Sequence, residues 1–118
     1  MSDVLNPVDV EKAIRELANR ITEGVKSVSK RYDLFLSADR AYEQSFARAY
    51  LAADGPAHER KYHAELATAA EREARDVADA AFRYADRTAK ALENELRAYQ
   101  SIGASVRAMY GTTQGVGR

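Results

Sequence analysis

Hydrophobic residues recur at steps of three or four through two long segments of the chain. In the first segment, residues 7–53, the apolar positions are Val10, Ile14, Leu17, Ile21, Val25, Val28, Tyr32, Phe35, Tyr42, Phe46, Ala49 and Ala53. This step is the period of one face of an α-helix, whereas a half-buried strand alternates every second residue. Asp39 takes one position of the stripe, with Ala38 beside it. We therefore predict a long amphipathic helix over this segment.

The second segment, residues 56–110, repeats the same spacing. Its apolar stripe consists of Tyr62, Leu66, Ala70, Val77, Ala81, Tyr84, Thr88, Leu92, Leu96, Tyr99, Ile102, Val106 and Met109. Between residues 67 and 81 the stripe is mostly alanine, which lets a neighbouring backbone approach closely but buries little area. No segment has the period of a strand, so the predicted fold class is all-α.

Asp54, Gly55 and Pro56 separate the two segments. Glycine can take the left-handed conformation that ends a helix, and proline suits the first turn of the next one. So short a connection favours two neighbouring antiparallel helices. The sequence thus predicts a long helical hairpin that turns at residues 54–56.

The outer ends of the hairpin also carry start and stop signals. Asn6 can cap the first helix, Pro7 suits its first position, and Asp9 can reach back toward the cap. Gly111 stands where a glycine often ends a helix. We expect a short lead over residues 1–6, the hairpin over 7–110 and a flexible tail over 111–118.

Gly24 is a weak point of the first predicted helix. Together with Ser27 and Ser29 it lowers the local helix propensity. The sequence leaves open whether residues 7–53 form one helix, a kinked helix or two helices.

Several apolar residues lie off the two stripes and would remain exposed on a single hairpin. They are Leu34, Leu36, Tyr50 and Phe82. Exposed apolar groups of this kind indicate a second contact surface. We expect two hairpins to pair into a four-helix-bundle homodimer, and we treat these four residues as candidates for a protein interface.

Charge limits the function classes. Lysine and arginine total 18, aspartate and glutamate total 18, and charged residues make up 31% of the chain. A net charge of zero argues against binding nucleic acid through bulk electrostatics. A local basic patch midway along the hairpin nevertheless gives the alternative hypothesis of a nucleic-acid-binding accessory, in which Phe82 or Tyr32 could stack on bases. Its candidate contacts are Lys26, Lys30, Arg31, Arg83, Arg87 and Lys90.

The residues that carry catalytic chemistry are sparse. The chain has no cysteine, and its two histidines, His58 and His63, are five positions apart and do not share a helix face. No Glu-x-x-His spacing and no glycine-rich phosphate loop occurs. We predict no catalytic, metal or cofactor site, and a protein that is not an enzyme.

The sequence also bears on location. The beginning of the chain lacks a signal-peptide pattern, and no apolar run approaches the roughly 20 residues that span a bilayer. We therefore expect a cytoplasmic protein that does not contact membranes.

Two stretches, `AYEQSFARAYLAADGPAHERKYHAELATAAE` (residues 41–71) and `ALENELRAYQSIGASVRAMYG` (residues 91–111), carry a resemblance. Over roughly residues 30–111, the chain resembles small helical accessory proteins of actinobacterial tailed phages and prophages. The resemblance implies a phage-encoded protein in the host cytoplasm that acts in DNA replication or recombination, or on a host protein. Our main functional hypothesis is a non-enzymatic helical interaction protein that binds another protein.

Overall fold

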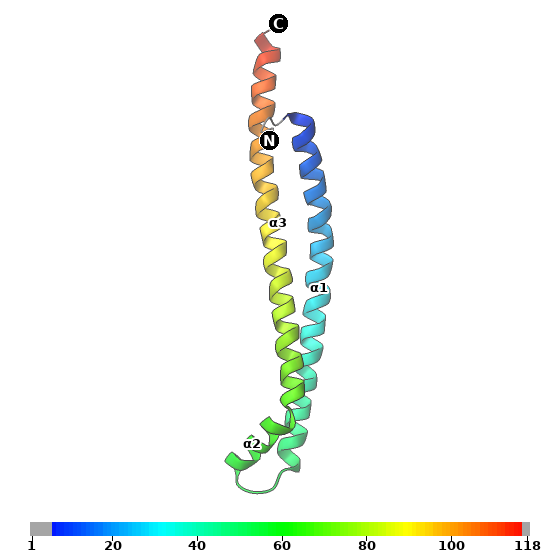
Figure 1. Ribbon diagram of the computed structural model, residues 1–118, viewed down its shortest axis with the longest axis vertical. Coiled ribbons are helices and arrows are strands. Elements are labelled where there is room, and N and C mark those ends of the chain that lie inside the picture. The colour runs from blue at the N-terminus through cyan, green and yellow to red at the C-terminus, as the bar shows by residue number, and fades with distance from the viewer. Residues whose placement is uncertain (1–5, 117–118) are drawn as a thin grey trace. The chain divides into compact units, whose positions relative to one another are not determined.

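The computed structural model describes residues 6–116, with side chains as far as Gly111, and consists of three α-helices (Figure 1). Helix α1 spans Pro7–Ala52, α2 spans Ala57–Ala67, and α3 spans Ala69–Val116. No strand occurs within residues 6–116, which confirms the all-α prediction. The contacts divide into two units: unit 1 takes the described residues up to Val25 and from Arg87 onward, and unit 2 is Lys26–Asp86.

Helix α1 begins as its sequence predicts. The backbone N–H of Asp9 donates to Oδ1 of Asn6 at 2.9 Å, and the side-chain amide of Asn6 donates to the Asp9 carboxylate at 3.0 Å. These bonds satisfy one of the N–H groups that a helix start leaves without a partner. Gly24 does not end the helix, because α1 continues without interruption to Ala52. Residues 1–5 of the predicted lead lie outside the described residues.

The prediction of a single helix after the turn is wrong, because Thr68 separates α2 from α3. Thr68 has φ −115° and ψ 20° and is buried. Both its N–H and its hydroxyl donate to the Ala64 carbonyl, at 3.1 and 2.6 Å. Figure 1 shows α2 set at an angle to the adjoining turns of α3 within unit 2. The sequence contains no glycine or proline at this break, so nothing local predicted it.

The connection between α1 and α2 has the left-handed glycine that the sequence predicts, but the next helix begins one residue later than predicted. Gly55 has a φ of 101°, a region that favours glycine. Pro56 lies at the N-cap of α2, so the helix itself begins at Ala57.

The helix end predicted at Gly111 is wrong, because α3 continues to Val116. Among the described residues, none would lie within 4 Å of a Cβ added at Gly111, so an alanine would fit there without a clash. Glycine costs a helix only about 1 kcal/mol relative to alanine and does not by itself stop it. Residues 117 and 118 of the predicted tail lie outside the described residues.

Unit 1 holds most of the buried hydrophobic side chains. They are Val10 and Leu17 from α1, and Ala89, Leu92 and Val106 from α3. Gly103 is buried beside them, and a Cβ at its position would lie 3.1 Å from Cγ1 of Val10. The Val10 side chain therefore packs directly against Gly103.

Unit 2 relies on aromatic side chains. The Phe82 ring from α3 lies 5.1 Å from Tyr32 and 6.5 Å from Phe35, both on α1. Farther along α1, the Phe46 ring lies between Tyr42 and Tyr50, at 6.1 and 6.3 Å. Offset or tilted aromatic pairs at these distances add favourable contact beyond the area they bury.

The apolar stripe predicted for residues 62–84 does not face inward. Tyr62, Leu66, Val77 and Tyr84 are all exposed, whereas Ala64 and Thr68 are buried. The inward face here consists of small or polar residues and Phe82, so hydrophobicity alone selected the wrong face. The predicted stripe of the first segment does face inward, because most of its residues between Val10 and Ala53 are buried or half-buried.

Replacing Gly24 with alanine should stabilise the protein by about 1 kcal/mol, because alanine favours the helix over glycine by that amount. A Cβ at this position would lie 3.8 Å from Cβ of Ala89 and 4.0 Å from Cδ1 of Leu92, which are ordinary contacts. Urea unfolding followed by circular dichroism measures the change.

Gly103→Ala is the matched control for Gly24→Ala. It offers the same gain in helix propensity, but its Cβ would press against the buried Val10 side chain at 3.1 Å. The gain should therefore shrink or reverse. A larger stabilisation by Gly103→Ala than by Gly24→Ala would contradict the close contact between Gly103 and the Val10 side chain.

Candidate functional site

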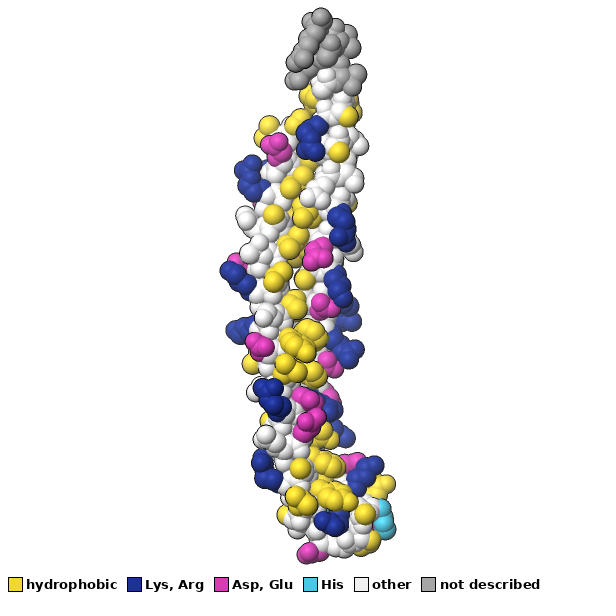
Figure 2. Space-filling view, turned by 180° about the vertical axis from the view of Figure 1, so that it is seen from behind, with side chains coloured by type: hydrophobic (Ala, Val, Ile, Leu, Met, Phe, Trp, Pro, Cys, Tyr) yellow, Lys and Arg dark blue, Asp and Glu magenta, His cyan; other side chains and the backbone are white. Residues whose placement is uncertain are grey.

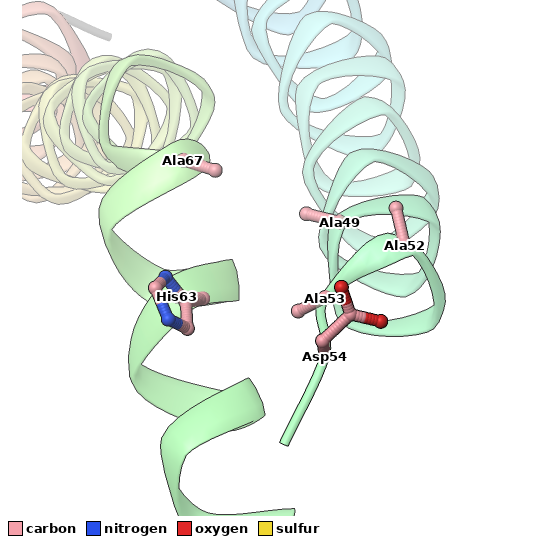
Figure 3. A pocket seen from close by; sticks show the side chains of 6 residues that line it. All are labelled: Ala49, Ala52, Ala53, Asp54, His63 and Ala67. Atoms are coloured by element: carbon pink, nitrogen blue, oxygen red, sulfur yellow. The ribbon is translucent and has the colours of Figure 1, made fainter.

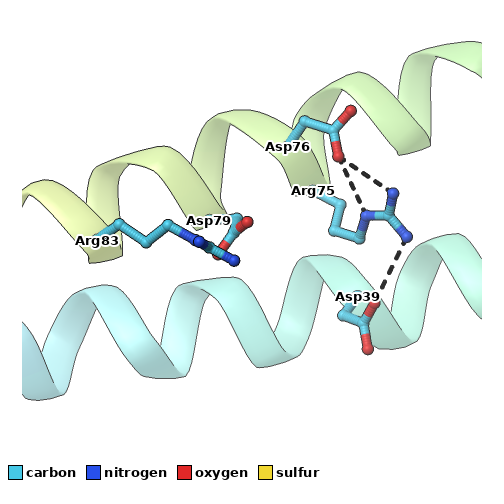
Figure 4. A network of polar contacts seen from close by, with 5 residues as sticks. All are labelled: Asp39, Arg75, Asp76, Asp79 and Arg83. Carbon is cyan, nitrogen blue, oxygen red and sulfur yellow. Dashed lines mark hydrogen bonds and ion pairs between the residues drawn. The ribbon is translucent and has the colours of Figure 1, made fainter.

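Charged side chains in unit 2 pair across and along the helices. Arg75 on α3 lies 3.9 Å from the Asp39 carboxylate on α1 and 3.1 Å from Asp76 on its own helix (Figure 4). Its guanidinium also lies 4.6 Å from the centre of the Tyr42 ring. Asp39 is the polar residue in the hydrophobic stripe of α1. Its carboxylate pairs with Arg75, whose guanidinium also packs on Tyr42, the next aromatic residue of that stripe.

Arg60 of α2 packs on the end of α1. Its guanidinium lies 4.8 Å from the centre of the Tyr50 ring, and Nη2 donates to the Tyr50 carbonyl at 3.4 Å. The last four carbonyls of a helix lack partners within it, and a cation there is favourable. Helix α1 has no basic residue in its own last turn, so Arg60 supplies that charge from a different helix.

The six basic residues predicted to contact nucleic acid are divided between the two units. Lys26, Lys30, Arg31 and Arg83 belong to unit 2, whereas Arg87 and Lys90 belong to unit 1. Nε of Arg83 lies 3.0 Å from the Asp79 carboxylate, which offsets its charge (Figure 4). Figure 2 shows acidic and basic side chains interleaved along the visible face of both units.

The aromatic residues predicted to stack on bases are engaged within the protein. Phe82 is half-buried between Tyr32 and Phe35, and Tyr32 itself contacts the Phe82 ring. These ring contacts occupy part of the surface that a base would need, although Tyr32 is 44% exposed.

The four residues predicted as a protein interface fall into two groups. Leu34 is exposed, whereas Leu36 is half-buried. Tyr50 and Phe82 are also half-buried, and their rings pack against Arg60 and the α1 aromatics. Of the four, Leu34 presents the most accessible surface to a partner.

Leu34 belongs to a larger apolar surface of unit 2, most of which comes from the predicted apolar stripe of the second segment. We define the Val77 face as Leu34 of α1 together with Ala74, Val77, Ala81 and Tyr84 of α3. Leu34, Val77 and Tyr84 are 46%, 64% and 69% exposed. Leu34, Ala74, Val77 and Ala81 also line an open hollow of about 280 Å³, with Arg31 and Ala78. The α3 members recur at i, i+3, i+7 and i+10, a spacing that indicates one shared helix face. The spacing does not indicate whether that face points inward or to solvent.

A second open hollow, of about 490 Å³, lies between the end of α1 and α2 (Figure 3). Ala49, Ala52, Ala53 and Asp54 form one wall, and His63 and Ala67 form the other. Four of its six lining side chains are single methyl groups. The hollow can admit a side chain, but it presents only one carboxylate and one imidazole for chemistry.

Within residues 6–116, no three or more histidine, aspartate or glutamate side chains gather in a way that could hold a metal ion. In the same part of the chain, no helix is both long enough and apolar enough to pass through a bilayer.

Comparisons with known proteins give no match. No family model, no curated protein and no solved structure corresponds to this chain.

Proposed function

We propose that this protein is a non-enzymatic helical interaction protein that pairs with a second copy of itself and binds another protein through its helical surfaces. One observation carries the proposal: more large hydrophobic side chains are exposed than buried. Among the described residues, 12 large hydrophobic side chains are exposed, whereas the buried hydrophobic set has six members, two of them alanine.

The total exposed surface supports the same conclusion. A compact monomer of this mass is expected to expose about 6,400 Å². The chain exposes 8739 Å². Contact with another chain would remove part of this surface from water, and apolar burial is the main favourable term in protein association.

A four-helix arrangement is the simplest way for two copies to cover these surfaces. Within each unit, α1 and α3 pack against each other and leave their other flanks exposed. Two such helix pairs can surround a shared core, as in four-helix bundles. The exposed hydrophobic residues that remain, including Leu51, Tyr62 and Leu66 near the α1–α2 connection, are then available to a different protein.

The resemblance to phage accessory proteins suggests the class of that partner. A component of replication or recombination, or a host protein in the bacterial cytoplasm, would fit it. Nucleic-acid binding, the alternative hypothesis, has less support, because Arg83 is paired with Asp79 and the half-buried Phe82 ring packs against Tyr32 and Phe35.

Sedimentation equilibrium tests the self-association. At tens of micromolar protein, the measured mass should be twice that of one chain and should fall on dilution. Because the proposed contact is largely apolar, the dimer should persist in high salt, which screens exposed charges. A single-chain mass at these concentrations would overturn the proposed dimer.

A further inference from the structure

We propose that the Val77 face is the surface on which a second copy of this chain docks, with the two α3 helices antiparallel across a two-fold axis between Ala80 and Ala81. This inference rests on the proposed dimer and specifies where it forms. Four features support it: the shape of the face, its self-complementarity, its charge, and the surface it would cover.

The Val77 face combines projecting side chains with a hollow. Val77 and Tyr84 project from α3 and are mostly exposed, and Ala74, Val77, Ala78 and Leu34 line the hollow beside them. The hollow measures about 280 Å³. A cavity of roughly 150 Å³ suffices to hold benzene. The hollow can therefore admit an aromatic ring from another chain.

A two-fold contact would pair these features with each other. In such an interface, if residue i of one copy meets residue j of the other, then j meets i in return. With the axis between Ala80 and Ala81, Val77 of each copy faces Tyr84 of the other, and the alanines meet at the centre. Tyr84 of each copy then enters the hollow beside Val77 of the other, while the central alanines let the helices approach.

The charge of the face suits self-docking. On α3, Arg75 and Asp79 lie away from the Val77 face, because each is two residues, about half a turn, from Val77. Asp76 and Arg83 lie about a third of a turn to one side of Val77. At the edges of the face are the base Arg31, which lines the hollow, and the acid Glu73, one turn before Val77. Two identical faces with a single charge sign would repel each other. The presence of both charge signs at the edges avoids this, and charged groups belong at the rim of an interface.

The exposed surface is sufficient for a dimer of ordinary size. Specific interfaces bury about 1,200–2,000 Å² in total, half of it from each partner. The chain exposes 8739 Å², whereas a compact monomer of its mass would expose about 6,400 Å². The difference is larger than the area that one partner buries in such an interface. The total surface therefore leaves room for an interface of ordinary size, with other surfaces remaining for a different protein.

Two variants of the full-length chain test whether the Val77 face forms the dimer. Val77→Asp would place two carboxylates in the dimer contact without a partner, which is costly for a buried charge. It should raise the dimer dissociation constant by a factor of about 100 or more, since each 1.4 kcal/mol is tenfold. Val25→Asp makes the same change at another exposed valine, 57% exposed, on α1. It should leave the dimer intact, and circular dichroism should show that both variants keep their helix content.

Cysteine crosslinking tests the position of the axis. The chain contains no natural cysteine, so each introduced thiol reports one position only. Ala81→Cys should oxidise to a disulfide-linked dimer at micromolar protein, because residues beside a two-fold axis lie close to their own copies. Ala47→Cys, at an exposed position on α1 away from the Val77 face, should remain mostly unlinked.

The outcomes separate the two proposals. If the unmodified protein is dimeric and Val77→Asp is equally dimeric, the Val77 face is not the contact, although the proposed dimer stands. If Ala47→Cys crosslinks as readily as Ala81→Cys, the placement of the axis is wrong. A monomeric unmodified protein would overturn the dimer and this interface together.

Discussion

Replacing Leu17 with alanine should lower the free energy of unfolding by about 2–5 kcal/mol, the usual cost of truncating a buried leucine. Leu17 is 4% exposed and is one of few large side chains buried in unit 1. A protein with so small a buried set has little other packing to compensate for the lost contacts. Thermal unfolding followed by circular dichroism should show a clear fall in Tm.

Leu51→Ala is the matched control on the same helix. Leu51 is 76% exposed, so the same change of side chain removes little burial. Exposed substitutions of this kind usually alter stability by less than about 0.5 kcal/mol. Equal losses for Leu17→Ala and Leu51→Ala would contradict the burial of Leu17.

Replacing both Gly55 and Pro56 with alanine should convert the protein into a dimer that exchanges helices between chains. The positive φ of Gly55 costs an alanine about 1–2 kcal/mol, and a Cβ there would lie 2.9 Å from the Glu59 carboxylate. A helical conformation removes this strain, and alanine at position 56 no longer interrupts a helix. We expect α1 and α2 to fuse, so that the chain no longer folds back on itself and α3 packs on α1 of another chain.

A thiol crosslinker detects the exchange. Asp39 and Arg75 make an ion pair between α1 and α3, so cysteines at these two positions report which chain supplies the partner helix. A short bismaleimide should link them within one chain in the parent protein and between two chains in the double variant. Gly55→Ala alone is the control, because Pro56 still opposes a continuous helix. Crosslinks within one chain in the double variant would show that the connection does not depend on these two residues.

The predictions that depended on local chemistry agree best with the structure. Asn6, Pro7 and Asp9 form the predicted start of α1, and Gly55 has the predicted positive φ. These features depend on a few neighbouring residues, whose hydrogen bonds and allowed backbone angles are determined by their own side chains. Sequence alone is sufficient for them.

The features that required knowledge of distant residues could not be predicted. Thr68 interrupts the second segment without a glycine or proline, while Arg60 packs on Tyr50 and Ala64 is buried. The energy of those contacts comes from residues on a different helix. Gly111 shows the reverse case, because a residue that often stops helices lies inside α3, which continues to Val116.

The residues of the Val77 face show the same difference between what neighbouring residues determine and what distant residues determine. Leu34 was identified from its position off the apolar stripe, and it is exposed as expected. Val77 and Tyr84 belong to the predicted apolar stripe, but in unit 2 the inward positions are held by Phe82 and Arg75.

The sequence by itself determined that the chain is helical, where α1 begins and where the chain leaves α1 after Ala52, because propensity, capping and glycine geometry act between neighbours. Only the tertiary structure decided which side of α3 in unit 2 faces inward. There the aromatic contacts of Phe82 and the cation–π contact of Arg75 with Tyr42 occupy the inner face, and Val77 and Tyr84 point to solvent. Periodicity measures how regularly apolar residues recur, whereas the inward direction depends on which side chains of a second helix they meet.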